Sequence, residues 1–404
     1  MKPKIRFNNN CWQKHKVGDL CDLLTGYPFP GDKILNRGKN LLMRGINITE
    51  GRIRHSDEID RYYNEDTIGL EKYRLQVGDL VIGMDGSKVG KNSALVTSKE
   101  NNSLLVQRVA RLRNEDKNLI NLIQIAVGSD KFIKYVEEMK TSSAIPHISP
   151  ADIRNFPLSL PEDSNERRLI ASYFTFLDSQ ISASTSRLAS LKQMKAASLQ
   201  AMFPQKGETV PKVRFKGFEG EWKKVKFSEL YERSSIKNDL SFGADKIISV
   251  ANMYFIKNSR QVDDDYLRSY NIMRLGDIAF EGHSSKEFAN GRFVENTIGD
   301  GIVSHIFVVM KPISKKYDLY FWKYYINNEN IMGKILCRCT KSSTMMNDIV
   351  VDDFLKESIL VPSYEEQIEI GKILTSLDYQ ITLQSQRLEK LKQIKSACLD
   401  KMFV

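Results

Sequence analysis

Two long stretches of the sequence carry hydrophobic residues at alternating spacings of four and three positions. This spacing is typical of the a/d seam of a coiled coil, in which one face of a helix packs against another helix. A polar residue interrupts both seams at the same place, as expected where the register of pairing matters. The pattern predicts two long helices that pair with each other, although an amphipathic stripe can also pack only on its own domain. The seam positions are Ile170, Phe174, Leu177, Ile181, Ser184, Leu188 and Leu191 in the first stretch, and Ile370, Leu374, Leu377, Ile381, Gln384, Leu388 and Leu391 in the second.

The two stretches belong to a duplication that runs through the whole chain. "RLASLKQMKAASLQAMFP", which begins at Arg187, matches "RLEKLKQIKSACLDKMFV", which begins at Arg387, at ten of eighteen positions. "PKIRF" near the start returns as "PKVRF" from Pro211, and each is soon followed by a tryptophan, Trp12 or Trp222. In between, "VGDLVIGMDGS" corresponds to "LGDIAFEGHSS", and "TSSAIPHI" to "KSSTMMND". A period this long is not that of a solenoid and indicates one internal duplication.

Each copy is expected to contain a mixed globular part followed by its long helix. In the first copy, residues 79–84 and 93–97 have the character of strands around a turn-rich loop, and helical spacing runs from Asn118 to Met139. The second copy has matching strands and a helix from about Asp318. Pro161 and Pro362 mark where the long helices should start. The predicted fold is α+β, with globular parts over 1–160 and 205–362, a central long helix over 161–204 and a C-terminal long helix over 363–404.

Composition narrows the class of protein. The chain has 404 residues, more than one hydrophobic core usually organises, and no apolar run long enough to span a membrane, so we expect a cytoplasmic protein of at least two domains. Five cysteines without metal-site spacing are expected to be free thiols. The net charge of +10 is compatible with a polyanionic partner without requiring one.

Motifs of catalysis are missing from the sequence. "GSKVGKN", from Gly86 to Asn92, lacks the spacing of a P-loop and its final Ser or Thr, so we interpret it as a hairpin turn that carries lysines. The five histidines show no H-E-x-x-H pattern, and there is neither a G-x-S-x-G elbow nor the glycine-rich cofactor loop of a methyltransferase. The residues therefore favour a binding protein with no catalytic residues and no metal site.

The chain resembles the specificity subunit of a type I restriction-modification enzyme over essentially its whole length. The similar features are the "PKVRF...GFEGEW" opening of a unit, the "LPEDSNERRLIASYFTFLD" and "VPSYEEQIEIGKILTSLD" helix starts, and the "RLxxLKQxKxAxLxxMF" helix endings. The first copy has "NERRLI" where the second has the more typical "EEQIEI".

This resemblance implies a non-catalytic subunit with two target-recognition domains, each reading one half of a split site in double-stranded DNA. It implies two antiparallel coiled-coil helices between those domains and a pseudo-two-fold internal repeat. It also implies partners: two modification subunits that methylate adenine with S-adenosylmethionine, and restriction subunits that act as motor-nucleases with ATP and magnesium. No cofactor is expected on this chain itself.

Candidate contact residues follow from polar and basic turns and from the helix endings. Arg and Lys suit phosphates and guanine edges, whereas Ser and His can complete base readout. The DNA-binding candidates are Arg44, Lys88, Lys91, Ser142, Ser143 and His147 in the first copy, and Ser284, Lys286, Arg292, Lys341, Ser342 and Ser343 in the second. The partner-binding candidates are Arg187, Lys192, Lys195, Arg387, Lys392 and Lys395.

Two other classes of protein remain as alternatives. A basic coiled-coil scaffold whose globular domains bind protein would explain the helices equally well, but it gives two divergent globular copies no purpose. An enzyme that acts on DNA unaided is disfavoured by the missing motifs.

Overall fold

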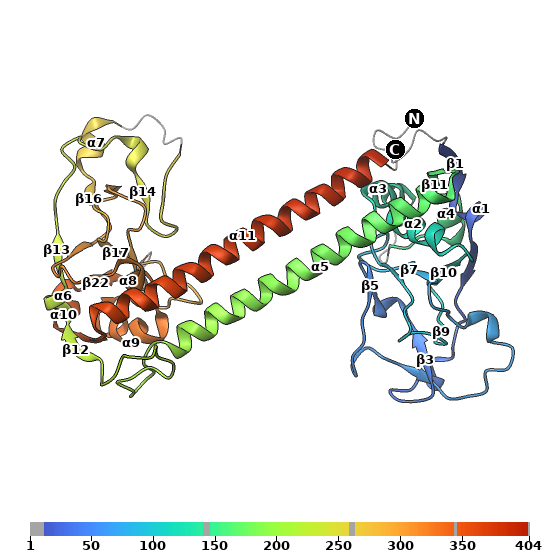
Figure 1. Cartoon of the computed structure of the whole chain (residues 1–404), viewed down its shortest axis with the longest axis horizontal. Helices are drawn as coiled ribbons and strands as arrows, with labels where there is room; N and C mark the ends of the chain where they lie inside the picture. The colour runs from blue at the N-terminus through green and yellow to red at the C-terminus, as the bar shows by residue number, and fades with distance from the viewer. Residues whose placement is uncertain (1–11, 140–145, 258–262, 343–345, 403–404) are drawn as a thin grey trace. The chain divides into compact units, whose positions relative to one another are not determined.

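A computed structural model of the chain describes residues 12–139, 146–257, 263–342 and 346–402. The chain forms two compact units: the first comprises residues 1–185 and 386–404, and the second comprises residues 186–385. Each unit therefore takes its long-helix segments from both copies of the duplicated sequence. Figure 1 shows the sheets and helices of the two units.

The first unit is built on a four-stranded antiparallel sheet in the order β2-β10-β7-β8. A separate two-stranded sheet pairs β1 with β11, and smaller sheets join β6-β3-β9 and β4-β5. The elements are β1 (Trp12–Lys16), α1 (Val17–Leu20), β2 (Asp22–Thr25), η1 (Gly31–Lys33), β3 (Asn40–Met43), η2 (Gly45–Asn47), β4 (Ile48–Thr49), β5 (Arg52–Ile53), β6 (Tyr62–Tyr63), η3 (Glu71–Tyr73), β7 (Leu80–Gly83), β8 (Ser93–Leu95), β9 (Leu104–Leu105), β10 (Val109–Arg113), α2 (Lys117–Val127), α3 (Asp130–Met139), α4 (Pro150–Asn155), β11 (Pro157–Pro161) and α5 (Ser164–Ala201), where η marks a 3-10 helix.

The second unit repeats the four-stranded sheet and the separate two-stranded sheet, whereas its smaller sheets pair β14 with β15, β16 with β19 and β21 with β22. Its four-stranded sheet has the order β13-β20-β17-β18, and β12 pairs with β23 as β1 pairs with β11. The elements are β12 (Lys223–Lys226), α6 (Phe227–Leu230), β13 (Tyr231–Ser234), η4 (Ala244–Lys246), β14 (Ile248–Ser249), β15 (Tyr254–Phe255), α7 (Asp264–Arg268), β16 (Asn271–Met273), β17 (Ile278–Glu281), β18 (Arg292–Glu295), β19 (Gly301–Val303), β20 (Val309–Pro312), α8 (Leu319–Tyr325), α9 (Glu329–Cys339), β21 (Thr340–Lys341), β22 (Asp348–Ile349), α10 (Val351–Lys356), β23 (Ser358–Val361) and α11 (Tyr364–Met402).

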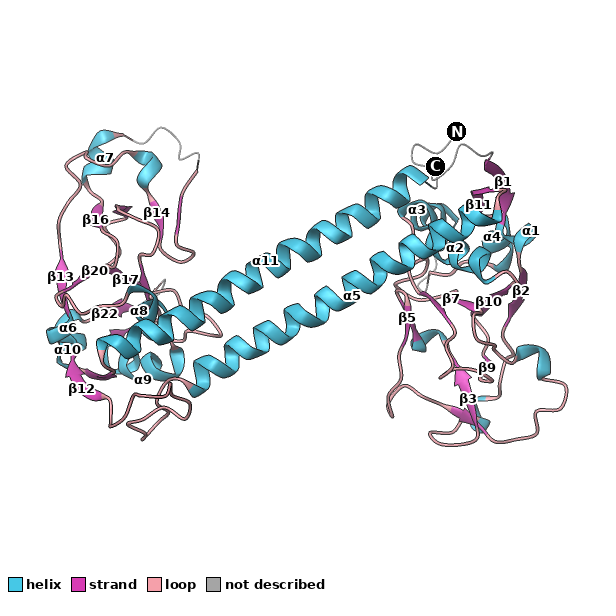
Figure 2. Ribbon diagram, in the orientation of Figure 1, coloured by secondary structure: helices cyan, strands magenta, loops and turns pink. Residues whose placement is uncertain are grey.

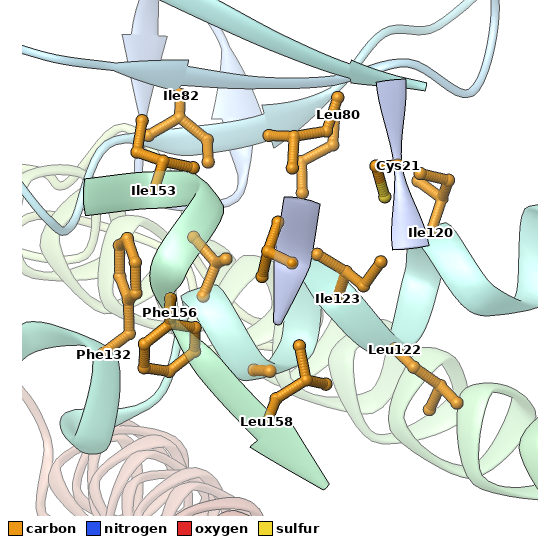
Figure 3. Close-up of a cluster of buried hydrophobic side chains, with 14 of the residues drawn as sticks. Cys21, Leu80, Ile82, Ile120, Leu122, Ile123, Phe132, Ile153, Phe156 and Leu158 are labelled. Carbon is orange, nitrogen blue, oxygen red and sulfur yellow. The ribbon is translucent and has the colours of Figure 1, made fainter. Parts of the chain in front are cut away.

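One inner strand of each main sheet, β7 in the first unit and β17 in the second, is buried on both faces. Leu80 and Ile82 of β7 join the core formed with α2, α4 and the long helices, whereas Val81 packs into a second cluster on the other face (Figure 3). β17 divides in the same way between Phe280 and Ala279. Alternation of side chains along a strand explains this split, because neighbouring residues point to opposite faces of the sheet.

The stretch of helical spacing from Asn118 to Met139 forms two helices, α2 and α3. The Ser129 hydroxyl donates to the carbonyl of Ala126 at 2.6 Å and accepts from the backbone N–H of Phe132 at 3.4 Å, so it ends one helix and caps the next. The second unit divides the equivalent stretch into α8 and α9.

The two long helices carry the predicted seam. Ile170, Phe174 and Leu177 of α5 are buried, and so are Ile370, Leu374 and Leu377 of α11. In the first unit the start of α5 shares a core with Leu391, Ile394 and Met402 near the end of α11, and in the second the start of α11 shares one with Leu199 and Met202 near the end of α5. The pairing is therefore antiparallel within each unit (Figure 2). The first long helix begins slightly later than expected: Pro161 is the last residue of β11, and α5 begins at Ser164.

Two further expectations concern cysteines and membranes. Cys21, Cys337, Cys339 and Cys398 are free thiols, and Cys11 lies outside the described residues. Among the helices that the structure describes, none combines the length and apolar character needed to cross a membrane.

Candidate nucleic-acid interface

The loop that follows β7 forms the centre of the candidate site in the first unit. β7 ends at Gly83, and the chain turns back through Gly86 and Gly90, both at positive φ (96° and 87°), before it pairs again as β8. Val89 is buried and anchors the loop, while Lys88 and Lys91 are exposed. The "GSKVGKN" segment is therefore the lysine-bearing hairpin turn that the sequence predicted.

A second segment brings His147 to the same strand end. The backbone N–H of Ile148 donates to the carbonyl of Met84 at 2.9 Å, and that of Gly86 donates to the carbonyl of Pro146 at 3.1 Å. The backbones of His147 and Asp85 consequently form an isolated antiparallel β-bridge. Both residues line a hollow of about 220 Å³ together with Met84, Arg108 and Ile148. Ser142 and Ser143, which the sequence places in the same segment, lie outside the described residues.

A third segment places the Arg44–Gly45 turn against Asp85. A side-chain Cβ at Gly45 would lie 3.5 Å from Asp85 Oδ1, so the Gly45 backbone lies beside the Asp85 side chain. Burial, together with the nearby positive charge of Arg61, lowers the pKa of Arg44. The candidates Arg44, Lys88, Lys91 and His147, which are distant in the sequence, thus lie on three segments that meet at one strand end.

The second unit presents a loop at the equivalent strand end, after β17. The backbone N–H of Asn347 donates to the carbonyl of Gly282 at 2.8 Å, and its side-chain amide donates to Ser284 Oγ at 2.9 Å. Ser284 Oγ itself donates to the carbonyl of Ala289 at 3.0 Å, which closes the loop. Lys286 is exposed in this loop, and Lys341 and Ser342 are exposed in and just after β21; Ser343 lies outside the described residues.

Arg292 differs from the other candidates because its guanidinium is engaged within the unit. Nη2 donates to the carbonyl of Ala251 at 2.7 Å, and the guanidinium carbon lies 4.8 Å from the centre of the Phe288 ring. Only 21% of the side chain is exposed, and Glu281 lies 3.6 Å away. These contacts show that Arg292 supports the fold of the loop, and its role as a DNA contact stays a prediction.

Sequence reasoning missed the charged residues at the two strand ends themselves. Asp85 forms an ion pair with Arg108 at 3.2 Å, and His283, at the equivalent position of the second unit, has its Nδ1 2.5 Å from Glu281 Oε1. The alignment of "VGDLVIGMDGS" with "LGDIAFEGHSS" sets Asp85 opposite His283, and this difference was the available signal. Arg108 carries no such local signal, because only the pairing of β10 with β7 brings it to Asp85.

Comparison with known proteins identifies the family to which this duplicated chain belongs. A family model described as the type I restriction modification DNA specificity domain matches residues 9–193 and, a second time, residues 219–393. The chain belongs to this family. It is accordingly a type I restriction-modification specificity protein with two target-recognition domains, for which the family implies DNA binding.

Individual relatives agree with the family match. Over 161 residues, 39% of the chain, the sequence is 29% identical to the type I restriction enzyme EcoAI specificity subunit of Escherichia coli, and this match spans 27% of that protein's length. The crystal structure of the type I restriction-modification S subunit from M. genitalium superposes with a TM-score of 0.61 at 15% identity, covering 100% of this chain and 99% of that one. The second comparison shows that the fold is shared.

The candidate partner contacts on the long helices of this specificity protein divide into two groups. Lys195 binds Asp378, Lys395 binds Asp178, and Arg387 donates to Gln180, so these three cations act in helix pairing. Arg187, Lys192 and Lys392 are exposed on the same helices. Within the part of the chain that the structure describes, no group of three or more His, Cys, Asp or Glu side chains could hold a metal ion.

Proposed function

We propose that the chain is the non-catalytic DNA-reading subunit of a type I restriction-modification complex, and that its two target-recognition domains read different halves of a bipartite site. The observation that carries this proposal is the pair of equivalent strand ends with different chemistry. The first presents Asp85, Arg108 and His147, whereas the second presents Glu281, His283 and Asn347.

Base pairs are distinguished in the major groove by their patterns of donors and acceptors. Two reading surfaces with the same scaffold and different polar groups therefore suit two different base sequences. Lysines close to both strand ends, Lys88 and Lys91 in one domain and Lys286 in the other, suit the phosphates that position a reader without carrying sequence information. The half-sites should consequently differ from each other.

The partners follow from the duplication of the helices. Because the two units share the strand order of their main sheets, one kind of modification subunit can bind each of them, and two copies with bound S-adenosylmethionine would methylate adenine. Restriction subunits that use ATP and magnesium would complete the complex. The exposed cations Arg187, Lys192 and Lys392 support such docking.

The first experiment tests recognition without catalysis. The purified chain is incubated with unmethylated DNA of mixed sequence and labelled S-adenosylmethionine, with and without the modification subunit. We expect no methyl transfer by the chain alone, and transfer to adenines of one split motif after the modification subunit is added. Methyl transfer by the chain alone, or transfer without a sequence motif, would contradict the proposal.

The second experiment tests whether the domains read independently. Residues 13–160 are exchanged for the matching part of a relative with a different motif, and the methylated motif is determined by sequencing. One half of the motif should change while the other half stays the same. A chimera that folds and assembles but loses recognition at both halves would refute independent readers.

A further inference from the structure

Arg108 lines the hollow at the end of β7, and one nitrogen of its guanidinium is hydrogen-bonded to Asp85. Arg108 Nη1 donates to Asp85 Oδ2 at 3.2 Å, and 63% of the Arg108 side chain is exposed. Among the described residues this is its one side-chain hydrogen bond, which leaves the Nε and Nη2 donors turned to no protein acceptor. Asp85 is 27% exposed and lies between Arg108 and the His147 segment.

The backbone of Arg108 is strained in a way that the sheet enforces. Its φ is +64°, a left-handed conformation that is unusual for a residue with a side chain. Its carbonyl accepts from the N–H of Met84 at 3.0 Å, and the next residue, Val109, pairs with Gly83. Such strain persists where the surrounding structure imposes it and is concentrated at binding sites. The strand pairing thus holds Arg108 in a conformation that the free chain would avoid.

The charge beside Arg108 distinguishes its possible ligands. A phosphate that approached this guanidinium would also approach the Asp85 carboxylate, and the two like charges would repel each other. A base edge carries no net charge and meets no such repulsion. Of the four bases, guanine offers two acceptors, N7 and O6, in the major groove, and these match two neighbouring donors of an arginine.

We propose that Arg108 is the base-reading residue of the first target-recognition domain, that it binds the N7 and O6 edge of a guanine, and that Asp85 is the positioning residue that orients it. This inference rests on the proposed function, because it assigns one base within the half-site read by that domain. Lys88 and Lys91, in the loop that follows Asp85, then hold the adjoining phosphates.

The test uses the complete complex of the chain with its modification subunits. The variants are Arg108→Lys, Arg108→Ala and Asp85→Asn, and the matched control is Arg37→Ala, an exposed arginine of the same domain. The readouts are the methylated motif and the affinity for duplexes that differ at single base pairs, each measured over a range of salt concentrations. Thermal melting of Arg108→Lys, which keeps the charge and most of the volume, checks the fold.

Both Arg108 variants should lose discrimination at a single G·C pair in one half-site, by about 10- to 100-fold, and leave the other half intact. Arg108→Lys should lose this discrimination with its salt dependence nearly unchanged, because a lysine keeps the charge but not the paired donors. Asp85→Asn should reduce discrimination at the same base pair, and Arg37→Ala should leave the motif intact.

Two results would overturn the assignment of Arg108. An unchanged motif in Arg108→Ala would show that it reads no base. A uniform loss of affinity for all sequences, with a salt slope reduced by about one, would show a phosphate contact instead. Both outcomes leave the parent complex with its split motif, so they are distinct from failure of the proposed function, in which the parent itself would show no motif.

Discussion

Two buried aspartates at equivalent positions show how the duplicated units have diverged residue by residue. Asp79 lies directly before β7 and Asp277 directly before β17, each after a glycine, and both are almost fully buried. Asp79 accepts two hydrogen bonds of 2.7 Å from the guanidinium of Arg113, which raises the pKa of that arginine. Asp277 accepts a hydrogen bond of 2.8 Å from the backbone N–H of Arg274, and among the described residues no arginine binds it in the bidentate way. Burial raises the pKa of Asp277 to about 6.

Substitution of Asp277 by Asn should stabilise the chain in a pH-dependent way. Because the pKa of Asp277 is raised in the folded state from 3.8 to about 6, its contribution is present below pH 3.8 and lost as the pH rises through 6. The advantage of Asp277→Asn in free energy of unfolding should therefore grow between pH 4 and pH 6.5, by up to about 3 kcal/mol. Urea unfolding at both pH values measures it. Asp79→Asn is the matched comparison and should destabilise by about 3 kcal/mol at neutral pH, because Arg113 loses its partner.

A histidine between two carboxylates stabilises the first unit. His55 has Nδ1 3.0 Å from Asp60 and Nε2 2.8 Å from Glu100, and only 3% of the Glu100 side chain is exposed. Burial alone would raise the pKa of Glu100, but hydrogen bonds from Thr97 and His55 together hold it below its usual value. This stabilisation is present above the ordinary pKa of Glu and is lost as the pH falls below it.

His55→Ala should lower the free energy of unfolding at pH 7 by about 3 kcal/mol, because it leaves a buried carboxylate without its partner. The loss should shrink as the pH falls below the ordinary pKa of Glu, because protonation removes the charge of Glu100. Urea denaturation across this range checks both statements. His305→Ala, at an exposed histidine of the second unit, is the control and should change stability by less than about 0.5 kcal/mol. Equal losses in the two variants would show that the carboxylate contacts of His55 contribute nothing.

At the scale of the elements, the duplication specifies how α5 and α11 pair. In the first unit Asp178 of α5 binds Lys395 of α11, and in the second unit Asp378 of α11 binds Lys195 of α5 at 2.6 Å. The two pairs are the same pair of duplicated positions with the helices exchanged. Tyr324 also donates to Asp378, so the second pair has an additional support. Such reciprocal contacts favour the antiparallel register over its alternatives.

A change of the two aspartates to lysine should weaken the helix pairing, and a further change of the two lysines to aspartate should restore it. Asp178→Lys with Asp378→Lys sets like charges beside Lys395 and Lys195 and should lower the melting temperature, at a cost of about 1 kcal/mol for each partly exposed pair. Addition of Lys395→Asp and Lys195→Asp should recover most of the loss in the first unit and less in the second, where Tyr324 loses its acceptor. Thermal melting at low and high salt measures this. If the fourfold variant melted no higher than the double one, the ion pairs would have no part in register.

At the scale of the whole molecule, α5 and α11 both run from one compact unit into the other. Their seams keep a seven-residue repeat, in which Ser184 and Gln384 are the buried polar positions. The length of these helices should consequently relate to the number of unread bases between the two half-sites.

Insertion of one heptad into both helices should change the preferred gap. It keeps the seam and lengthens each helix by about 10 Å, which equals roughly three base pairs of B-DNA. Binding should fall on the original site and recover best on a longer gap, measured with duplexes that differ only in that gap. A heptad inserted into α5 alone is the control and should weaken binding at every gap length. An unchanged preferred gap in a folded double insertion would refute the idea.

The sequence alone determined the features that depend on local pattern. The seam from Ile170 to Leu191, the duplicated helix endings and the hairpin turn around Lys88 were predicted because periodicity, repetition and turn chemistry are written in neighbouring residues. Even the break between α2 and α3 had a local signal in Gly128 and Ser129, although the continuous apolar spacing concealed it. The family could be predicted for the same reason.

Only the tertiary structure decided which polar residues act together. Arg108 meets Asp85 because β10 pairs with β7, and Lys195 meets Asp378 because two helices are antiparallel. Arg292 contacts Ala251 and Phe288 of its own unit, which its local sequence did not indicate, and its role as a DNA contact stays a prediction. The reason is physical: a charged side chain has the same local sequence signature whether it is solvated, paired or buried, and its partner is chosen by the packing of segments far apart in the chain.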